Sequence, residues 1–300
     1  MFKSYVWLTL CVIVWGSNFV FGKILVQYFP PMLITSLRLF MIVLFLFSLS
    51  FFYRQRQKVV HKHDILLILI LGIVGVFINQ WSFFMGLTTA DPTTAALILA
   101  TTPILTGFLA AIFLHEKITI RMVIGSCIAI IGIFYVVTNG SLTNVQVDKG
   151  LLWIIVTMVT FSIMIIITRL LSNRIDPFTV TLHSNIVALT ISIPFIFIIN
   201  KDKDIMLDAT IPIWLLLIVT AIVVHGMANL VWNNHIRHVN ASNASMLTNL
   251  EPFVAMVVGF IVLAKPITGI ELFGALLIVA GVVLSTYQFA HKNKFTVTRK

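Results

Sequence analysis

Charged residues and cysteines are scarce in this sequence. Charged residues make up only 10% of its 300 positions, where a soluble domain carries about 25%. Asp and Glu together number 10, and the 2 cysteines form neither a CxxC pair nor a cluster with histidine. The composition therefore argues against a soluble domain, and nothing indicates a disulfide framework or a zinc site.

Motifs that mark enzymes and nucleotide-driven pumps are also missing. His115-Glu116 begins like an HExxH motif, but no second histidine follows. The sequence has no GxSxG nucleophile elbow and no phosphate-binding loop, and Asp91, Asp148 and Asp176 all lie at the ends of apolar runs. We therefore expect neither an enzyme nor an ATP-driven pump, and neither a metal nor another cofactor.

Long apolar runs are what the sequence has in abundance. Hydrophobic residues make up 59% of the chain, and the mean hydropathy is +1.06. A transmembrane helix needs about 20 mainly apolar residues, and these runs are continuous, whereas the strands of a membrane barrel alternate. We predict an all-α polytopic membrane protein with ten transmembrane helices. The predicted spans are residues 4–27, 31–53, 64–87, 92–114, 119–138, 150–171, 177–199, 211–234, 241–263 and 267–290.

The distribution of Lys and Arg predicts how these spans are oriented. When the N-terminus is placed in the cytoplasm, most of the 20 Lys and Arg residues fall on the cytoplasmic side. Cytoplasmic loops carry an excess of these residues, so we predict a multi-pass protein of a bacterial plasma membrane with both termini cytoplasmic. The net charge of +10 is then a signal of topology, and no nucleic-acid partner is expected.

The two halves of the sequence resemble each other at constant offsets. Pro252 follows Pro103 by 149 residues, and Pro177 follows Pro31 by 146 residues, with neighbouring matches in both regions. These matches predict a duplicated unit of five helices. Because five is odd, the second copy enters the membrane in the opposite orientation, which gives the inverted-topology repeats common in secondary transporters. The predicted units are a first repeat at 1–138, a second at 150–290 and a cytoplasmic tail at 291–300.

Four stretches carry a family resemblance. They are "WGSNFVFGKIL" (15–25), "LRL" (37–39), "TPILTGFLAAIFLHEKIT" (102–119) and "IGSCIAIIGIFYV" (124–136). Together they resemble the EamA repeat of the drug/metabolite transporter superfamily, over nearly the whole chain and twice. The resemblance implies ten spans with both ends inside, and export or exchange of small metabolites, often amino acids or related compounds.

The second copy departs from the family pattern at one charged position. The family's short link with a glutamate is present at Glu116, but its counterpart 149 residues later is Lys265. The ion pairing of that glutamate is therefore in question in the second copy. Lys23 and Arg169 occupy matching places at the ends of their spans, and we expect both to reach the lipid headgroups.

Ionisable groups inside the apolar runs are the first candidates for a site. A charged group at mid-bilayer costs about 2.5–3.5 kcal/mol on insertion scales and commonly faces a cavity or a partner. Glu251 lies about ten residues into its span, near the midplane, and Arg38 about two turns into its own. We expect Arg38 to attract a carboxylate and Glu251 to bind an ammonium group or a proton. The alternatives are a protonated Glu251 bonded to a neighbouring helix, and an Arg38 bonded to helix-end carbonyls.

Amide, aromatic and imidazole side chains mark further faces of the predicted helices. His225, Asn229 and Trp232 recur at helical spacing, and Gln80 matches Asn229 at the offset of 149. The alternative for each is a hydrogen bond between helices, worth about 0.6–2 kcal/mol in membranes. Besides Glu251 and Arg38, the predicted cavity residues are Trp15, Asn18, Asn79, Gln80, His225, Asn229, Trp232 and Asn249.

Prolines and glycines predict where helices bend and where they approach closely. Pro103 and Pro252 each remove a backbone hydrogen bond near mid-membrane, and we expect kinks there that serve gating. Gly125 and Gly132 lie seven residues apart on one helix face, and the same pair recurs 149 residues later. Small residues at this spacing predict close helix packing.

These observations favour a secondary transporter that exports or exchanges a small metabolite, an amino acid or a related compound, by alternating access. Spans 1–4 and 6–9 would form its central cavity, and spans 5 and 10 would brace it. The open alternatives are a channel, a lipid-handling membrane protein, or a transporter of a cationic, drug-like or sugar-type metabolite. Protons are the candidate coupling ion, membrane lipids are the surroundings, and a homodimer is an open alternative.

Overall fold

The computed structural model describes residues 2–51, 62–138, 140, 148–172, 174–199, 209–236 and 247–286. Within these ranges the chain is helical and contains no β-strand, so the predicted all-α class is confirmed. Eight of the described helices are long and apolar enough to cross a membrane, judged by length and composition. Two shorter apolar helices, Glu251–Leu263 and Gly269–Ser285, accompany them.

Helices of the first half follow the predicted spans closely. The helix predicted at 64–87 is one continuous run in which a π-helical segment, η1, separates α3 from α4. The helix predicted at 92–114 is divided into α5 and α6. The elements are α1 (Phe2–Tyr28), α2 (Pro31–Ser50), α3 (Lys62–Ile70), η1 (Leu71–Ile78), α4 (Asn79–Thr89), α5 (Pro92–Leu99), α6 (Thr102–Phe113) and α7 (Ile120–Val137).

The described elements of the second half follow the same order, and most of residues 241–248, which match α5, lie outside the described residues. Residues 241–246 of the ninth predicted span and 287–290 of the tenth lie outside the described residues. The elements are α8 (Lys149–Ser172), α9 (Pro177–Ile199), α10 (Ile211–Val219), η2 (Thr220–Met227), α11 (Ala228–Ile236), α13 (Glu251–Leu263) and α14 (Gly269–Thr286).

Element boundaries recur at the offset that the sequence indicates. Helices α10, α11, α13 and α14 and the segment η2 each begin 149 residues after α3, α4, α6, α7 and η1. The left-handed backbone conformations at His115 (φ 56°) and Ala264 (φ 51°) are also 149 residues apart. The π-helical segments are notable because this geometry is rare and is frequent at functional sites.

Aspartate-proline pairs begin two of the helices. Pro92 and Pro177 occupy first-turn positions, where the missing backbone N–H has no intrahelical partner to lose. The carboxylate of the preceding Asp91 accepts the Thr94 N–H at 3.0 Å, and that of Asp176 accepts the Phe178 N–H at 3.0 Å. Each helix start is therefore specified by three or four consecutive residues.

Prolines also divide the helix made of α5 and α6. The Leu99 carbonyl has no N–H to accept from Pro103, and the Thr102 hydroxyl donates to it at 2.5 Å. The helix restarts at Thr102, with Pro103 in its first turn. Pro252 likewise lies in the first turn of α13, directly after Glu251, which takes the place of Thr102.

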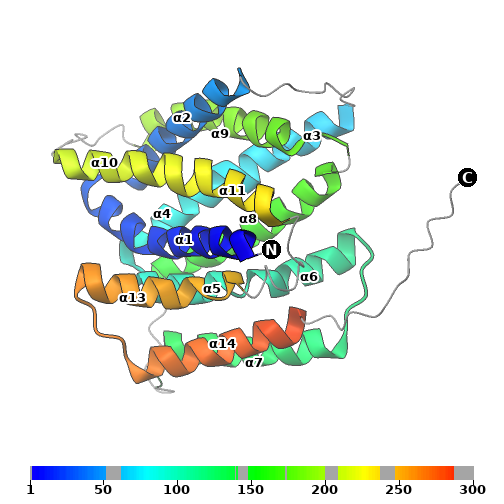
Figure 1. Cartoon of the computed structure of the whole chain (residues 1–300), viewed down its shortest axis with the longest axis vertical. Helices are drawn as coiled ribbons and strands as arrows, with labels where there is room; N and C mark the ends of the chain where they lie inside the picture. The colour runs from blue at the N-terminus through cyan, green and yellow to red at the C-terminus, as the bar shows by residue number, and fades with distance from the viewer. Residues whose placement is uncertain are drawn as a thin grey trace, which may run out of the picture.

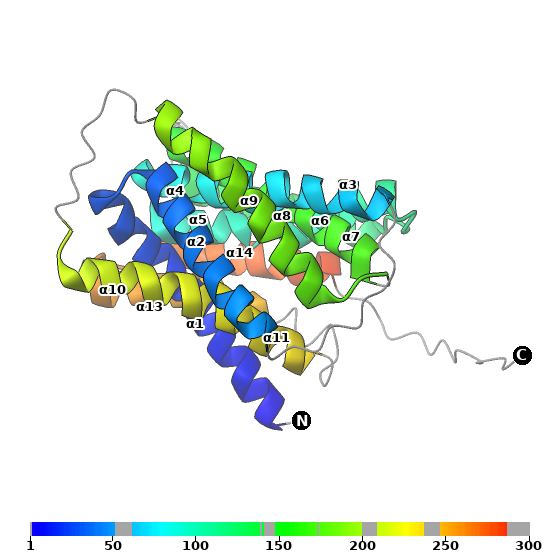
Figure 2. The same cartoon turned by 90° about the horizontal axis from the view of Figure 1, so that it is seen from above.

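Glycines bring α7 and α14 into close contact at one end of the molecule (Figure 1). A Cβ atom added at Gly281 would lie 2.5 Å from the Gly125 carbonyl oxygen, and one added at Gly132 would lie 3.0 Å from that of Gly274. Neither position has room for a side chain, so the predicted glycine packing is confirmed. At the other end α2 packs against α9, and α1 lies between these groups, against α13 and α11 (Figure 1). Seen from above, α2 and α9 run obliquely to α10 (Figure 2).

Candidate functional site

One turn of α1 contacts three other elements. The Trp15 indole Nε1 donates to the Val224 carbonyl in η2 at 3.1 Å. A Cβ atom added at Gly16 would lie 2.8 Å from the Glu251 carbonyl oxygen, so α13 approaches α1 here. The Asn18 side-chain oxygen accepts from Arg38 of α2 at 3.4 Å. The fold therefore places Trp15 and Asn18 of α1 where α2, η2 and α13 converge.

Arg38 lies at the centre of this convergence and is fully buried. Its Nη2 group donates to the Thr220 carbonyl at 3.3 Å and lies 2.6 Å from Nδ1 of His225. The guanidinium carbon lies 4.9 Å from the centre of the Phe84 ring, a cation–π distance. Arg38 thus joins α2 to α1, to α4 and, through Thr220 and His225, to two turns of the π-helical segment η2.

The charge of Arg38 has no described counter-ion. None of the ion pairs in the described part of the chain includes Arg38, and its Nε atom is buried without a hydrogen-bond partner there. Gln80, one helical turn from Phe84 on α4, has a buried Oε1 atom that also lacks a partner. Buried polar atoms without protein partners indicate a place for a water molecule or a polar ligand group.

Two tryptophans, Trp15 of α1 and Trp232 of α11, form an aromatic wall, with Trp15 three residues before Asn18. The rings of Trp15 and Trp232 lie 4.9 Å apart, centre to centre. Phe83, the residue that matches Trp232 in the first half, packs against Phe19 of α1 at 5.5 Å. Trp232 and its counterpart Phe83 therefore both contact α1, at Trp15 and Phe19, which are one helical turn apart. Asn18, which accepts a hydrogen bond from Arg38, lies between these two positions in the sequence.

Glu251 is the first residue of α13, and its main chain faces Gly16. No side-chain hydrogen bond to its carboxyl group is present among the described residues. Asn249, two residues earlier, is buried in the turn that precedes α13. Both residues thus lie where α13 begins after a turn, and this break in the helix is at Pro252, where the sequence predicts a kink.

The remaining predicted residues divide between the site and a helix interface. Asn229 lies one turn after His225 and donates to its carbonyl at 2.7 Å. Asn79 faces away, and its amide donates to the Thr157 carbonyl and the Thr160 hydroxyl of α8 at 2.9 and 3.0 Å. Asn229 therefore lies next to His225 on the same helical run, and Asn79 has the alternative role of a bond between helices.

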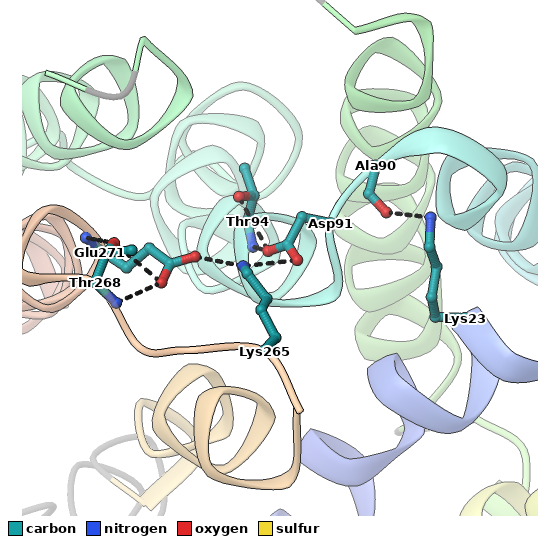
Figure 3. Close-up of polar contacts among 7 residues, drawn as sticks. All are labelled: Lys23, Ala90, Asp91, Thr94, Lys265, Thr268 and Glu271. Atoms are coloured by element: carbon teal, nitrogen blue, oxygen red, sulfur yellow. Dashed lines mark hydrogen bonds and ion pairs between the residues drawn. The ribbon is translucent and has the colours of Figure 1, made fainter. Parts of the chain in front are cut away.

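A second polar cluster lies at the connection between α13 and α14 (Figure 3). The Lys265 ammonium group contacts Asp91 at 2.7 Å and Glu271 at 2.5 Å. Glu271 also forms a capping box with Thr268, in which each side chain accepts the other's backbone N–H at 3.1 and 3.2 Å. Lys265 therefore ties the start of α14 to the start of α5.

This cluster explains the departure from the family pattern. On the matching connection, Glu116 pairs with Arg169 at the end of α8 at 2.7 Å. The equivalent of that pair would join residue 265 to Lys23, and two lysines cannot pair. Lys265 contacts Asp91 and Glu271 instead, and the Lys23 ammonium donates to the Ala90 carbonyl at 3.0 Å (Figure 3). It also donates to the Thr88 carbonyl at 3.2 Å.

Sequence reasoning missed several partners in these clusters. The cap motifs at Asp91 and Glu271 are visible in the sequence, but their shared contact with Lys265 is not. Phe84 and the Thr220 carbonyl carry no sequence signal for contact with Arg38. The sequence likewise carries no signal for the bonds of Lys23 to the Thr88 and Ala90 carbonyls or for the pair of Arg169 with Glu116.

Comparison with known proteins places the chain in a family. A model of the EamA-like transporter family matches residues 2–138 and again residues 148–287. The chain belongs to this family. A solved structure shares the fold, with a TM-score of 0.65 and a sequence identity of 16%. The match covers 93% of this chain and 95% of the chain in that structure.

Named relatives of this EamA-like chain cover it almost completely. The Bacillus subtilis protein YyaM, named an uncharacterized transporter, is 26% identical over 274 residues, which are 90% of this chain and 89% of that protein. A Salmonella typhimurium protein named a probable amino-acid metabolite efflux pump is 25% identical over 292 residues, 93% of each. Because the described residues include eight helices long and apolar enough to cross a membrane, the chain is a multi-pass membrane protein of a transporter family.

Proposed function

We propose that the protein is a secondary transporter that exports or exchanges an amino acid or a related small metabolite by alternating access. The observation that carries the proposal is the turn of α1 at which Arg38, the two tryptophans and the start of α13 converge. Family membership supports transport, and the name of the Salmonella typhimurium relative supports the substrate class.

The proposed architecture is ten transmembrane helices in two inverted five-helix repeats, 1–138 and 150–290, with both termini cytoplasmic. Recurrence of the helix starts and π-helical segments 149 residues apart supports this arrangement. Inverted repeats give a transporter two states of similar energy, because the halves can exchange conformations. The interruptions at Pro103 and Pro252 would supply the irregular backbone that a mid-membrane site needs.

A zwitterion suits the two ionisable residues of the site. Arg38 is a buried cation without a described counter-ion, and in a low-dielectric interior an anionic group of the substrate would be strongly favoured nearby. Glu251 would receive the ammonium group or a proton. The aromatic wall of Trp15 and Trp232 would contact the apolar part of the molecule.

Counterflow and efflux from proteoliposomes test this function. Vesicles loaded with each radiolabelled amino acid in turn are diluted into buffer with and without an inward proton gradient. At least one amino acid should leave faster with the gradient. Glu251→Gln, which keeps the size of the side chain but not its charge, should abolish the stimulation.

Glu116→Gln is the matched control, because Glu116 is a partly exposed carboxylate paired with Arg169 outside the site. It should respond to the gradient as the wild type does. If Glu251→Gln leaves efflux of every active substrate unchanged, Glu251 has no part in the mechanism. If the wild type moves no amino acid, the substrate class is wrong.

A further inference from the structure

A small cavity lies between α2, α9 and the run of η2 and α11. Its volume is about 50 Å³, and its polar lining consists of Thr181, Asn185, His225 and Asn229. One water needs about 10–15 Å³ of such volume, so the cavity has room for a functional group but not for a whole amino acid. Thr181 and Asn185 of α9 were not among the residues that the sequence singled out.

The contact with Arg38 determines the tautomer of His225. A guanidinium group carries only donors, so the short contact of 2.6 Å requires Nδ1 of His225 to accept. A ring whose Nδ1 accepts a hydrogen bond carries its proton on Nε2. Protonation of Nδ1 would place two donors against each other, so the imidazole remains neutral as long as this contact lasts.

The Nε2–H group of His225, a residue that lines this cavity, is a donor that the contact with Arg38 leaves free. No hydrogen bond from it to another described residue is present. Of the other polar side chains, the Thr181 hydroxyl donates its single hydrogen to the Pro177 carbonyl at 2.8 Å, and the Asn185 amide donates one of its two hydrogens to the Thr181 carbonyl at 2.8 Å. Asn229 donates to the main chain of His225 itself.

Arg38 does not line the cavity but lies behind His225, fully buried. Its positive charge therefore acts on the cavity through the imidazole that it holds. In a low-dielectric interior this charge makes the cavity favourable for an anion, and it strengthens the donor character of Nε2–H.

We infer that the cavity binds the carboxylate of the substrate, and that His225 donates its Nε2–H to a carboxylate oxygen in the tautomer that Arg38 sets. The inference rests on the proposed function and deepens it. It makes His225 the residue that distinguishes an amino acid from the corresponding amine. Arg38 is then a positioning residue, which orients the donor without contacting the substrate.

Nitrogen-15 NMR of imidazole-labelled protein in lipid tests the tautomer in the wild type. The His225 signals, assigned by their loss in His225→Asn, should show an unprotonated Nδ1 and a protonated Nε2. A transported amino acid should shift the Nε2 signal, and its decarboxylated amine should not. A proton on Nδ1, or an equal response to the amine, would overturn the inference.

Two variants separate the donor from the acceptor in transport. His225→Asn keeps an acceptor near the Nδ1 position and removes the donor, so KM for the amino acid should rise about 10–100-fold, as expected for a lost hydrogen bond to a charged group. His225→Gln keeps a donor near the Nε2 position and should raise KM less. An unchanged KM in His225→Asn refutes the donor role.

His183→Asn is the matched control. His183 lies on α9, is exposed, and its Nδ1 contacts the Thr179 carbonyl of its own helix at 2.8 Å, away from the cavity. It should leave KM unchanged. Wild-type transport of an amino acid with an unchanged KM in His225→Asn would refute this inference and leave the proposed function intact. Absence of wild-type transport would refute the function, while the NMR result would still report the tautomer.

Discussion

Replacing Lys265 by methionine should destabilise the folded protein more than replacing Arg169 by methionine. Both cations form ion pairs at 2.7 Å, but their surroundings differ. Lys265 and Glu271 are 32% and 10% exposed, whereas Arg169 and Glu116 are 61% and 42% exposed. Water screens the second pair more strongly, so equal distances do not imply equal energies.

The magnitude follows from these environments. An exposed ion pair contributes about 0.2–1 kcal/mol, and we expect that range for Arg169 with Glu116. Hydrogen bonds to charged groups contribute about 1.5–3 kcal/mol, and we expect the lower part of that range for Lys265 with Glu271. Without Lys265, Asp91 and Glu271 would also face each other with no cation between them, which adds to the loss.

Double-mutant cycles measure these coupling energies. Glu271→Gln and Asp91→Asn remove charge but keep side chains that can still cap α14 and α5, so each cycle isolates the ion pair. Stability is measured as SDS-driven unfolding in mixed micelles, followed by circular dichroism. A coupling energy for Lys265 with Glu271 that is no larger than that for Arg169 with Glu116 would refute the reasoning.

The pH dependence of this stability has a definite sign. Partial burial lowers the pKa of Lys265, but the hydrogen bonds and charges of Asp91 and Glu271 outweigh it, so its pKa lies above the ordinary 10.5. The contribution is therefore complete below the pKa of the unfolded chain and is lost as the pH rises through the folded one. The stability difference between wild type and Lys265→Met should be constant from about pH 7 to 9 and shrink only above about pH 10.5. A difference that already disappears near neutral pH would contradict the assignment.

Three further substitutions test the packing and the site. Gly281→Ala should lower the free energy of unfolding in SDS by about 1–3 kcal/mol, because its Cβ would lie 2.5 Å from the Gly125 carbonyl oxygen. Gly269→Ala is the control and should leave that free energy unchanged, since a Cβ there would have no neighbouring atom within 4 Å. Equal effects of the two substitutions would contradict glycine packing. Arg38→Met should abolish amino-acid transport yet leave stability near that of the wild type, because removing a buried charge also removes its desolvation cost; retained transport would contradict a role for Arg38. Asn79→Ala should lower the free energy of unfolding by about 1 kcal/mol, because it removes the bonds to α8. It should leave KM unchanged in the proteoliposome assay, and a raised KM would show that Asn79 contributes to substrate binding.

Local sequence signals anticipated much of the helical structure. Hydropathy located the spans, because a helix that crosses a membrane must be apolar over a fixed length. The interruption before Pro103 and the glycine contact between Gly125 and Gly281 follow from properties of single residues. Such signals act within one helix or at one contact point, so these features can be predicted from a short stretch of sequence without knowing how the rest of the chain folds.

The membrane itself limits what hydropathy can say about helix faces. Lipid tails are as apolar as leucine, so a face that meets lipid and a face that meets another helix have similar composition. Asn79 and Gln80 are adjacent and both polar, yet Asn79 bonds α8, whereas Gln80 has a buried Oε1 atom without a partner among the described residues. Their sequence positions alone could not separate these roles.

By itself the sequence determined that this protein is a helical membrane protein and where its helices start, bend and recur, since these follow from apolar length, proline, glycine and caps. Only the tertiary structure decided the partners of Arg38, which lie 182 and 187 residues away at Thr220 and His225. It also decided that Lys265 contacts Asp91 and Glu271, whereas Glu116, the residue at the matching position, pairs with Arg169. Periodicity fixes the direction of a side chain on its own helix, but the packing of helices in space fixes what that side chain meets.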